Sequence, residues 1–213
     1  MNKIYLVTRP EHDDTTYYLS KWSKESINMA EEHNIKILDL QGKKANKKEV
    51  ESRLRKFSPQ LVVFNGHGDE NTVSGHKNQP VIIAGDNESV LKEKMVFAIS
   101  CRSAKNLGPM SVKKGAVCYA GYMDDFIFFY DPEHITRPLA DKTARLFLEP
   151  QQKFIESLLK GNTIDESLTR TKKAMMDNMT QLLASDSGDA YLAKYLWWNV
   201  KNLVAHGDKN AAF

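Results

Sequence analysis

The fold is decided by two similar stretches of the sequence, Leu61-Val62-Val63-Phe64-Asn65-Gly66-His67-Gly68 and Met95-Val96-Phe97-Ala98-Ile99-Ser100-Cys101. Each begins with an apolar run, rich in Val, Ile and Phe, that does not alternate with polar residues. Such runs are typical of strands in a parallel sheet whose two faces are both covered. In these sheets the chemistry lies beyond the carboxyl ends of the strands. The pattern therefore predicts that His67 and Cys101 meet there as base and nucleophile, which favours a cysteine hydrolase.

Segments typical of strands and helices alternate on either side of these stretches. We expect main strands at Ile4–Thr8, Ile35–Leu40, Leu61–Asn65, Val96–Ser100 and Ala116–Ala120, a short edge strand at Val81–Ala84 and a last strand at Leu203–Ala205. We expect helices at about Asp13–Glu32, Lys47–Phe57, Ala140–Leu159 and Ile164–Ala184, and one that begins at Cys101. This alternation implies right-handed crossovers and an α/β fold, a three-layer α/β/α sandwich with a mostly parallel sheet. Residues 1–213 contain no repeat or linker, so a single domain is expected.

Composition limits the function classes. The chain is 41% hydrophobic and 27% charged, as is ordinary for a soluble globular protein. Its net charge of +3 is spread out and does not favour nucleic acid as a partner. The sequence shows no secretory signal, and the apolar stretch from Tyr195 to Ala205 is too short and too interrupted to span a bilayer. With two cysteines and no export signal, we expect a cytoplasmic protein without disulfides.

Cys101 is the stronger nucleophile candidate of the two cysteines. A thiolate is the reactive form, and a position at the start of a helix, beside Arg102, would lower the pKa of the thiol. The alternative is a buried thiol that acts as a small hydrophobe. That alternative suits Cys118, which lies inside the apolar segment Ala116–Ala120, better than it suits Cys101.

His67 is the matching base candidate. It lies between two glycines, where the backbone can turn sharply and approach a substrate closely. The N–H of Gly68 is not shielded by a side chain and can face a developing oxyanion. A structural turn histidine is the alternative, because Gly-His-Gly alone is a weak signal. His206, which also follows an apolar run, is a second candidate base.

Several other chemistries fit less well. Pairing Cys101 with His206 would match amidotransferase-like enzymes, but these need a nucleophile flanked by glycine, and Ile99–Ser103 contains none. A cysteine phosphatase needs an arginine six residues after the cysteine, where this chain has Leu107. No CxxC, HExxH or histidine pair at ligand spacing is present, so no metal site is expected.

Together, Phe64-Asn65-Gly66-His67-Gly68 and Ala98-Ile99-Ser100-Cys101 resemble the His-Gly and Ser-Cys segments of the caspase-like cysteine peptidases. This clan includes caspases, legumain, gingipains, separase and the bacterial CHAT peptidases. The segment from Gly115 to Asp125 is similar to the strand and acidic loop of the CHAT and separase branch. Asn202–Asp208 is similar to the closing strand of that branch. The resemblance covers most of the chain from about Ile4 onward.

The resemblance implies a thiol endopeptidase with Cys101 as nucleophile and His67 as general base and acid. It implies an oxyanion hole made by the backbone N–H groups of Gly68 and Cys101, no third catalytic residue and no cofactor. The expected partner is a protein or peptide substrate, and the existence of an activating partner protein is left open. Neither nucleic acid nor a membrane is expected as a partner.

The resemblance also indicates where substrate specificity arises. Separase-like enzymes hold an acid after the strand that follows the nucleophile, where this chain has Asp124 and Asp125. These residues predict cleavage after a basic residue, arginine ahead of lysine, with Asp125 slightly preferred. The rival is Arg9, at the position where caspases hold an arginine that receives an acidic side chain. A solvated turn is the alternative for the two aspartates.

Two other functions remain open on the sequence. The first is a catalytically silent caspase-like domain that acts as an interaction or sensor module. The second is a doubly wound domain that binds a small ligand.

Overall fold

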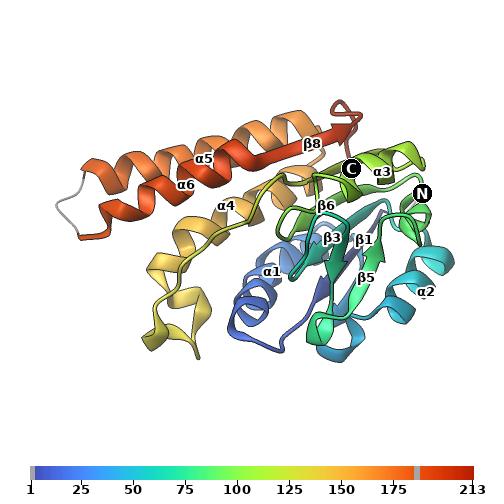
Figure 1. Cartoon of the computed structure of the whole chain (residues 1–213), viewed down its shortest axis with the longest axis horizontal. Coiled ribbons are helices and arrows are strands. Elements are labelled where there is room, and N and C mark those ends of the chain that lie inside the picture. Colours follow the sequence, from blue (N-terminus) through green and yellow to red (C-terminus); the bar gives the residue numbers. More distant parts are fainter. Residues whose placement is uncertain (1–2, 185–187) are drawn as a thin grey trace.

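The computed structural model describes residues 3–184 and 188–213. Its main sheet contains six strands: β1 (Ile4–Arg9), β2 (Lys36–Gln41), β3 (Leu61–Asn65), β6 (Met95–Ile99), β7 (Cys118–Tyr122) and β8 (Leu203–Gly207). The order across the sheet is β2-β1-β3-β6-β7-β8 (Figure 1). All neighbouring pairs are parallel except β7 and β8, which are antiparallel. The carboxyl ends of β1, β3, β6 and β7 therefore meet at one edge.

Helices cover both faces of this sheet (Figure 1). They are α1 (Asp14–Glu32), α2 (Lys47–Phe57), α3 (Leu107–Lys113), α4 (Lys142–Leu159), α5 (Ile164–Ala184) and α6 (Ala193–Asn202). One core packs α1, α4, α5 and α6 against the sheet, and the other packs α2, α3 and a small ribbon against its opposite face. The ribbon pairs β4 (Thr72–Ser74) with β5 (Pro80–Ile83) in antiparallel orientation. The expected three-layer α/β sandwich is confirmed.

The apolar runs form central strands because both of their faces are buried. Along β3, Leu61 and Val63 lie in one core, whereas Val62 and Phe64 lie in the other. All five residues of β3 and all five of β6 are buried. Burying a side chain of this size contributes about 1.5–3 kcal/mol, so both strands are held firmly at the centre of the sheet.

Besides shifts of one or two residues at the ends of several elements, the structure differs from the local expectations in the following features. The helix expected at Cys101 is absent, because the chain turns there and α3 begins only at Leu107. The strand expected at Val81–Ala84 is β5, which pairs with β4 and not with an edge of the main sheet. Strand β7 begins two residues later than Ala116, and α6 was not anticipated. Among the described residues, no helix is both long and apolar enough to cross a membrane.

Candidate active site

His67 and Cys101 emerge from neighbouring strands at the same level. Strands β3 and β6 are paired in parallel, with Asn65 opposite Ile99. His67 lies two residues beyond Asn65, and Cys101 lies two residues beyond Ile99. Paired strands lie about 4.8 Å apart. The register therefore places both residues at the same level, just beyond the ends of two neighbouring strands.

Gly68 is packed closely against the strand that carries the cysteine. A Cβ atom at position 68 would lie 3.1 Å from both Cβ and Oγ of Ser100 and 2.7 Å from the Thr72 carbonyl oxygen. Gly68 lies opposite Val73 in an isolated antiparallel β-bridge. The two hydrogen bonds of this bridge are made by the neighbouring residues: the Ser74 N–H donates to the His67 carbonyl, and the Asp69 N–H donates to the Thr72 carbonyl. Gly68 and Val73 therefore form a non-hydrogen-bonded pair of an antiparallel ladder, in which the N–H groups of both residues point away from the partner strand. The Gly68 N–H is therefore directed away from Val73.

The turn after Cys101 replaces the expected helix. Arg102 has φ of 56°, in the left-handed region, which does not continue into a right-handed helix. Its N–H donates to the carbonyl of Asp124, and the N–H of Ala104 donates to the carbonyl of Tyr122. These bonds tie the turn to the end of β7. Among the described residues, no acceptor is hydrogen-bonded to the N–H of Cys101, so this N–H is available beside the thiol.

The two cysteines differ in accessibility, as expected, but the pKa of Cys101 is not lowered. Burial, together with the nearby Asp125 charge, raises the pKa of the Cys101 thiol. The prediction of a lowered pKa is wrong because no helix begins at this residue. The Cys101 thiol donates a long hydrogen bond, 3.9 Å, to the Phe126 carbonyl. Cys118 is fully buried in β7, and burial raises its pKa to about 12, so it is inert.

Replacing Asp125 should make the thiol more reactive. The Asp125 carboxylate raises the pKa of Cys101 and also pairs with the Arg102 guanidinium, 3.0 Å away. Asp125→Asn removes the repulsion between the Asp125 carboxylate and a Cys101 thiolate, and it leaves the positive charge of Arg102 uncompensated beside the sulfur. We expect the pH profile of iodoacetamide labelling at Cys101, measured by peptide mass spectrometry, to shift to lower pH. An unchanged or upward-shifted profile would show that burial alone sets this pKa.

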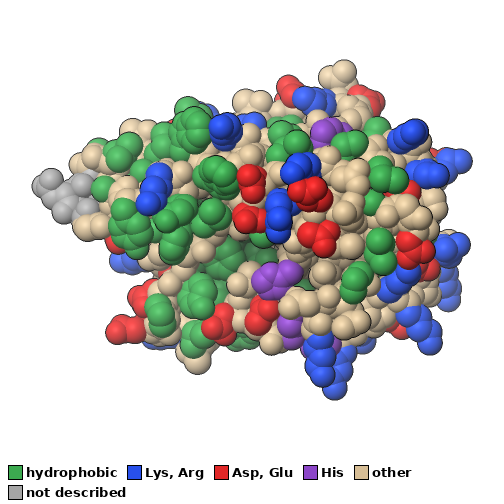
Figure 2. Space-filling model, viewed as in Figure 1, with side chains coloured by type: hydrophobic (Ala, Val, Ile, Leu, Met, Phe, Trp, Pro, Cys, Tyr) green, Lys and Arg blue, Asp and Glu red, His purple; other side chains and the backbone are tan. Residues whose placement is uncertain are grey.

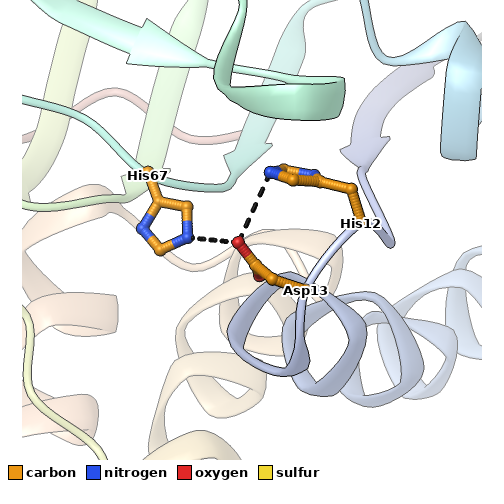
Figure 3. Close-up of side chains that lie close together, drawn as sticks. All are labelled: His12, Asp13 and His67. Atoms are coloured by element: carbon orange, nitrogen blue, oxygen red, sulfur yellow. Dashed lines mark hydrogen bonds and ion pairs between the residues drawn. The ribbon is translucent and has the colours of Figure 1, made fainter.

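Asp13 is a site residue that sequence reasoning missed (Figure 3). Its Oδ2 lies 2.8 Å from Nε2 of His67, and its Oδ1 accepts the Thr16 N–H that caps α1. With Nε2–H donated to Asp13, the Nδ1 atom of His67 keeps its lone pair. This is the arrangement in which a carboxylate fixes the tautomer and orientation of a catalytic histidine. No sequence signal marks it, because the two residues are 54 positions apart.

The hydrogen bonds to Asp13 also bear on its titration. Burial raises the pKa of this carboxyl group, but hydrogen bonds from Thr16 and His67 outweigh burial and hold it below its ordinary value. Because the pKa of Asp13 is lower in the folded than in the unfolded chain, the ionised carboxylate stabilises the fold at pH values above the unfolded-state pKa. This stabilisation is lost as the pH falls through the lowered, folded-state pKa. Asp13 is therefore ionised throughout the neutral range.

The two candidate specificity aspartates lie in the turn tied to Cys101. Asp125 is exposed and paired with Arg102, and both side chains remain substantially open to solvent, at 52% and 43%. Asp124 is half-buried, and its Oδ1 accepts the N–H of Asp125. An exposed ion pair contributes about 0–1 kcal/mol, so a cationic ligand can replace Arg102 at little cost.

Arg9, the rival specificity residue, has all of its side-chain N–H groups hydrogen-bonded within the protein. It is 2% exposed at the end of β1. Its Nε and Nη2 donate to the two carboxylate oxygens of Asp39, Nη2 also donates to Gln41, and Nη1 donates twice to Ser20. All five N–H donors of a guanidinium are thereby used. Arg9 holds β1, β2 and α1 together, and this arrangement does not favour its role as a receptor for an acidic substrate.

Helix α6 positions the loop after β7. Asn199 is fully buried, and its side chain accepts the N–H of Ile127 at 3.1 Å and donates to the Ile127 carbonyl at 2.6 Å. Trp198 Nε1–H donates to the carbonyl of Asp125 at 2.9 Å. Ile127 and Trp198, with Lys194 and Tyr195, line a hollow of about 340 Å³. Hydrogen bonds from Trp198 and Asn199 of α6 therefore hold the loop that carries Asp125 and Phe126 in place.

The fold is that of the caspase-like peptidases, as comparison with solved structures shows. The complex of the pro- and mature domains of Porphyromonas gingivalis RgpB matches with a TM-score of 0.60 over 98% of this chain and 47% of that chain, at 11% identity. A structure described as a protease matches with a TM-score of 0.61 over 99% and 48%, at 16% identity. The separase–securin complex of Saccharomyces cerevisiae matches with a TM-score of 0.53 over 97% and 12%, at 11% identity.

These similarities extend to the fold only, because the identities are low. The chain spans about half the length of the RgpB chain. No protein-family model and no curated protein sequence matches it.

Proposed function

We propose that the protein is a cysteine endopeptidase in which Cys101 is the nucleophile and His67 the general base and acid. The observation that carries this proposal is the register of β3 and β6, from which both residues leave the sheet at the same level. The proposal is supported by a fold shared with RgpB and separase, and it extends to a single peptidase domain over residues 1–213. The resemblance to the CHAT branch rests on the sequence segments alone.

The surroundings of Cys101 suggest how the thiol becomes reactive. Because its pKa is raised, the free thiol is mostly protonated at neutral pH. His67, held through Nε2 by Asp13, removes the thiol proton with Nδ1 as sulfur attacks the peptide carbonyl. The resulting imidazolium protonates the leaving amine, and water then hydrolyses the thioester. The N–H groups of Gly68 and Cys101 stabilise the oxyanion, at about 3 kcal/mol for each donor.

Asp13 acts through His67 in this proposal. We expect Asp13→Asn to lower kcat about 100-fold, since an amide cannot stabilise the imidazolium and favours the wrong tautomer. Asparagine is also a good helix N-cap, so α1 and the melting temperature should be preserved. A displaced acid limb of the pH–rate profile, where His67 becomes protonated and stops acting as the base, would identify a positioning role if KM is little changed. Full activity in this variant would exclude it.

The substrate is proposed to carry a basic residue on the amino side of the cleaved bond, arginine ahead of lysine. The Asp125 carboxylate can form a bidentate pair with a guanidinium once Arg102 is displaced, and a weaker contact with an ammonium. We expect kcat/KM to fall in the order Arg, Lys, Asn, Asp on matched peptides. Because Asp125→Asn also changes the reactivity of the thiol toward every peptide, the readout is the ratio of the Arg value to the Asn value, which should fall about tenfold. A preference for Asp that is lost in Arg9→Ala would overturn this assignment.

A peptide library tests the proposed function without assuming a substrate. The purified protein is incubated with the library, and new termini are identified by mass spectrometry. We expect cleavage by the wild-type chain and none by Cys101→Ala. Equal cleavage by both would trace the activity to a contaminant. The lack of cleavage, together with unreactive Cys101, would favour the silent interaction module.

A further inference from the structure

A second chemical feature involves the same histidine. His12 and Asp13 come from the loop between β1 and α1, and His67 comes from the end of β3 (Figure 3). One ligand atom from each lies within 4.8 Å of the others. In particular, Asp13 Oδ2 lies 2.8 Å from His67 Nε2 and 3.4 Å from His12 Nε2. From the arrangement of these three donors we propose a zinc site formed by His12, Asp13 and His67.

The donor set has the chemistry that zinc prefers. Zn²⁺ binds imidazole nitrogen and carboxylate oxygen at about 2.0–2.2 Å, and many sites use three protein ligands with one open position. Tetrahedral ligands at those bond lengths lie about 3.4 Å from one another. The 3.4 Å separation of Asp13 Oδ2 from His12 Nε2 matches this value. The 2.8 Å hydrogen bond between Asp13 Oδ2 and His67 Nε2 must lengthen, which side-chain rotations allow. Two imidazoles favour zinc over magnesium and calcium, which prefer oxygen ligands.

The loop that supplies two of the ligands is already ordered. Thr16 Oγ1 accepts the backbone N–H groups of both His12 and Asp13, at 3.1 and 3.2 Å. The Asp13 Oδ1 atom is occupied by the helix cap, which leaves Oδ2 to face the histidines. A metal ion can therefore bind without unfolding the start of α1.

Exposure allows an ion to enter and leave. The His67 and Asp13 side chains are 39% and 36% exposed, whereas that of His12 is only 11% exposed. The Nδ1 atom of His12 is buried and has no hydrogen-bond partner among the described residues. The tautomer of His12 is thus set by whatever its Nε2 atom binds. In the structure this partner is Asn78 Oδ1, 2.9 Å away, a contact that zinc would replace.

Zinc at this site would act as a reversible inhibitor, a consequence that rests on the proposed function. The ion would take the Nε2 lone pair of His67 and the carboxylate that orients the ring. His67 could then no longer keep the Nε2–H tautomer that leaves Nδ1 as the base. The three ligands belong to two segments of the chain, which is why no spacing motif reveals them.

The test measures zinc binding and not activity. Zinc is titrated into the untagged Cys101→Ala chain at neutral pH in competition with a chromogenic chelator. We expect one zinc ion per chain, and affinity losses greater than about tenfold in His12→Gln, Asp13→Asn and His67→Gln. His33→Gln, at the exposed C-terminal end of α1, is the matched control and should bind zinc normally. Affinity that survives in both His12→Gln and His67→Gln would overturn the proposed site.

Cobalt provides a measurement that does not depend on the folding of the variants. Co²⁺ bound to the wild-type chain should give visible bands of a four- or five-coordinate centre without a sulfur charge-transfer band. A six-coordinate spectrum or no binding would contradict the site. The proposed zinc site and the proposed peptidase activity can be refuted independently of one another. An inactive chain that binds zinc through these residues leaves the site intact, and an active chain that does not bind zinc refutes the site alone.

Discussion

Cys101→Ala and His67→Ala are each expected to abolish peptide hydrolysis, with kcat/KM reduced by a factor on the order of 10⁴ or more. The first removes the nucleophile, and the second leaves a thiol of raised pKa without a base. Both variants should fold, because the Cys101 side chain is only partly buried and the His67–Asp13 pair is open to solvent. Rates on the best library peptide, with melting temperatures recorded in parallel, check this expectation.

Two further variants serve as controls for this pair. His206, in β8, donates its Nε2–H to the Ala104 carbonyl oxygen, 2.8 Å away, and Cys118 is buried in β7. We expect His206→Ala and Cys118→Ala to keep most of the activity, with a stability loss in Cys118→Ala. If His206→Ala were inactive and His67→Ala active, the assignment of the base would be wrong.

Gly68→Ala should be nearly as damaging as loss of the dyad, although it removes no functional group. The new Cβ would lie 2.7 Å from the Thr72 carbonyl oxygen, closer than such contacts allow, so the backbone must shift. The shift moves the Gly68 N–H away from the developing oxyanion, and loss of one such donor lowers kcat about 100- to 1000-fold. Steady-state kinetics should show the loss in kcat, with KM little changed.

Gly188→Ala is the matched control, because a Cβ at position 188 meets nothing within 4 Å. It should retain normal kinetics. Normal kcat in Gly68→Ala would exclude the Gly68 N–H from the oxyanion hole.

Strands and helices with a clear hydrophobic pattern could be predicted from the sequence. Strands β3 and β6 are continuous apolar runs, and α2 is an amphipathic segment capped by Asn46. The bounds of β3 and α2 are those expected from the pattern, and β6 begins and ends one residue earlier than expected. Once these strands are adjacent and parallel, the proximity of His67 and Cys101 follows from sheet geometry. The fold could therefore be predicted, and the role of the candidate pair stays a prediction.

Features set by long-range contacts could not be predicted in this way. The chain after Cys101 forms a turn and not a helix, because Arg102 and Ala104 bond to carbonyl groups at the end of β7. Asp13 reaches His67 only in the folded chain, and Asn199 of α6 holds Ile127 across a similar distance in sequence. The pairing of Arg9 with Asp39 is also a contact between strands that its position alone does not reveal.

The pairing of Cys101 with His67 is tested most directly by trapping the nucleophile during turnover. The chain is incubated with a mixture of peptidyl acyloxymethyl ketones that carries every side chain next to the reactive group. The adduct is then located by peptide mass spectrometry. We predict a single adduct on Cys101 that forms in wild type and His206→Ala and does not form in His67→Ala. An adduct that forms at the same rate in His67→Ala, or one found on Cys118, would contradict the assignment of His67 and Cys101 as the catalytic pair.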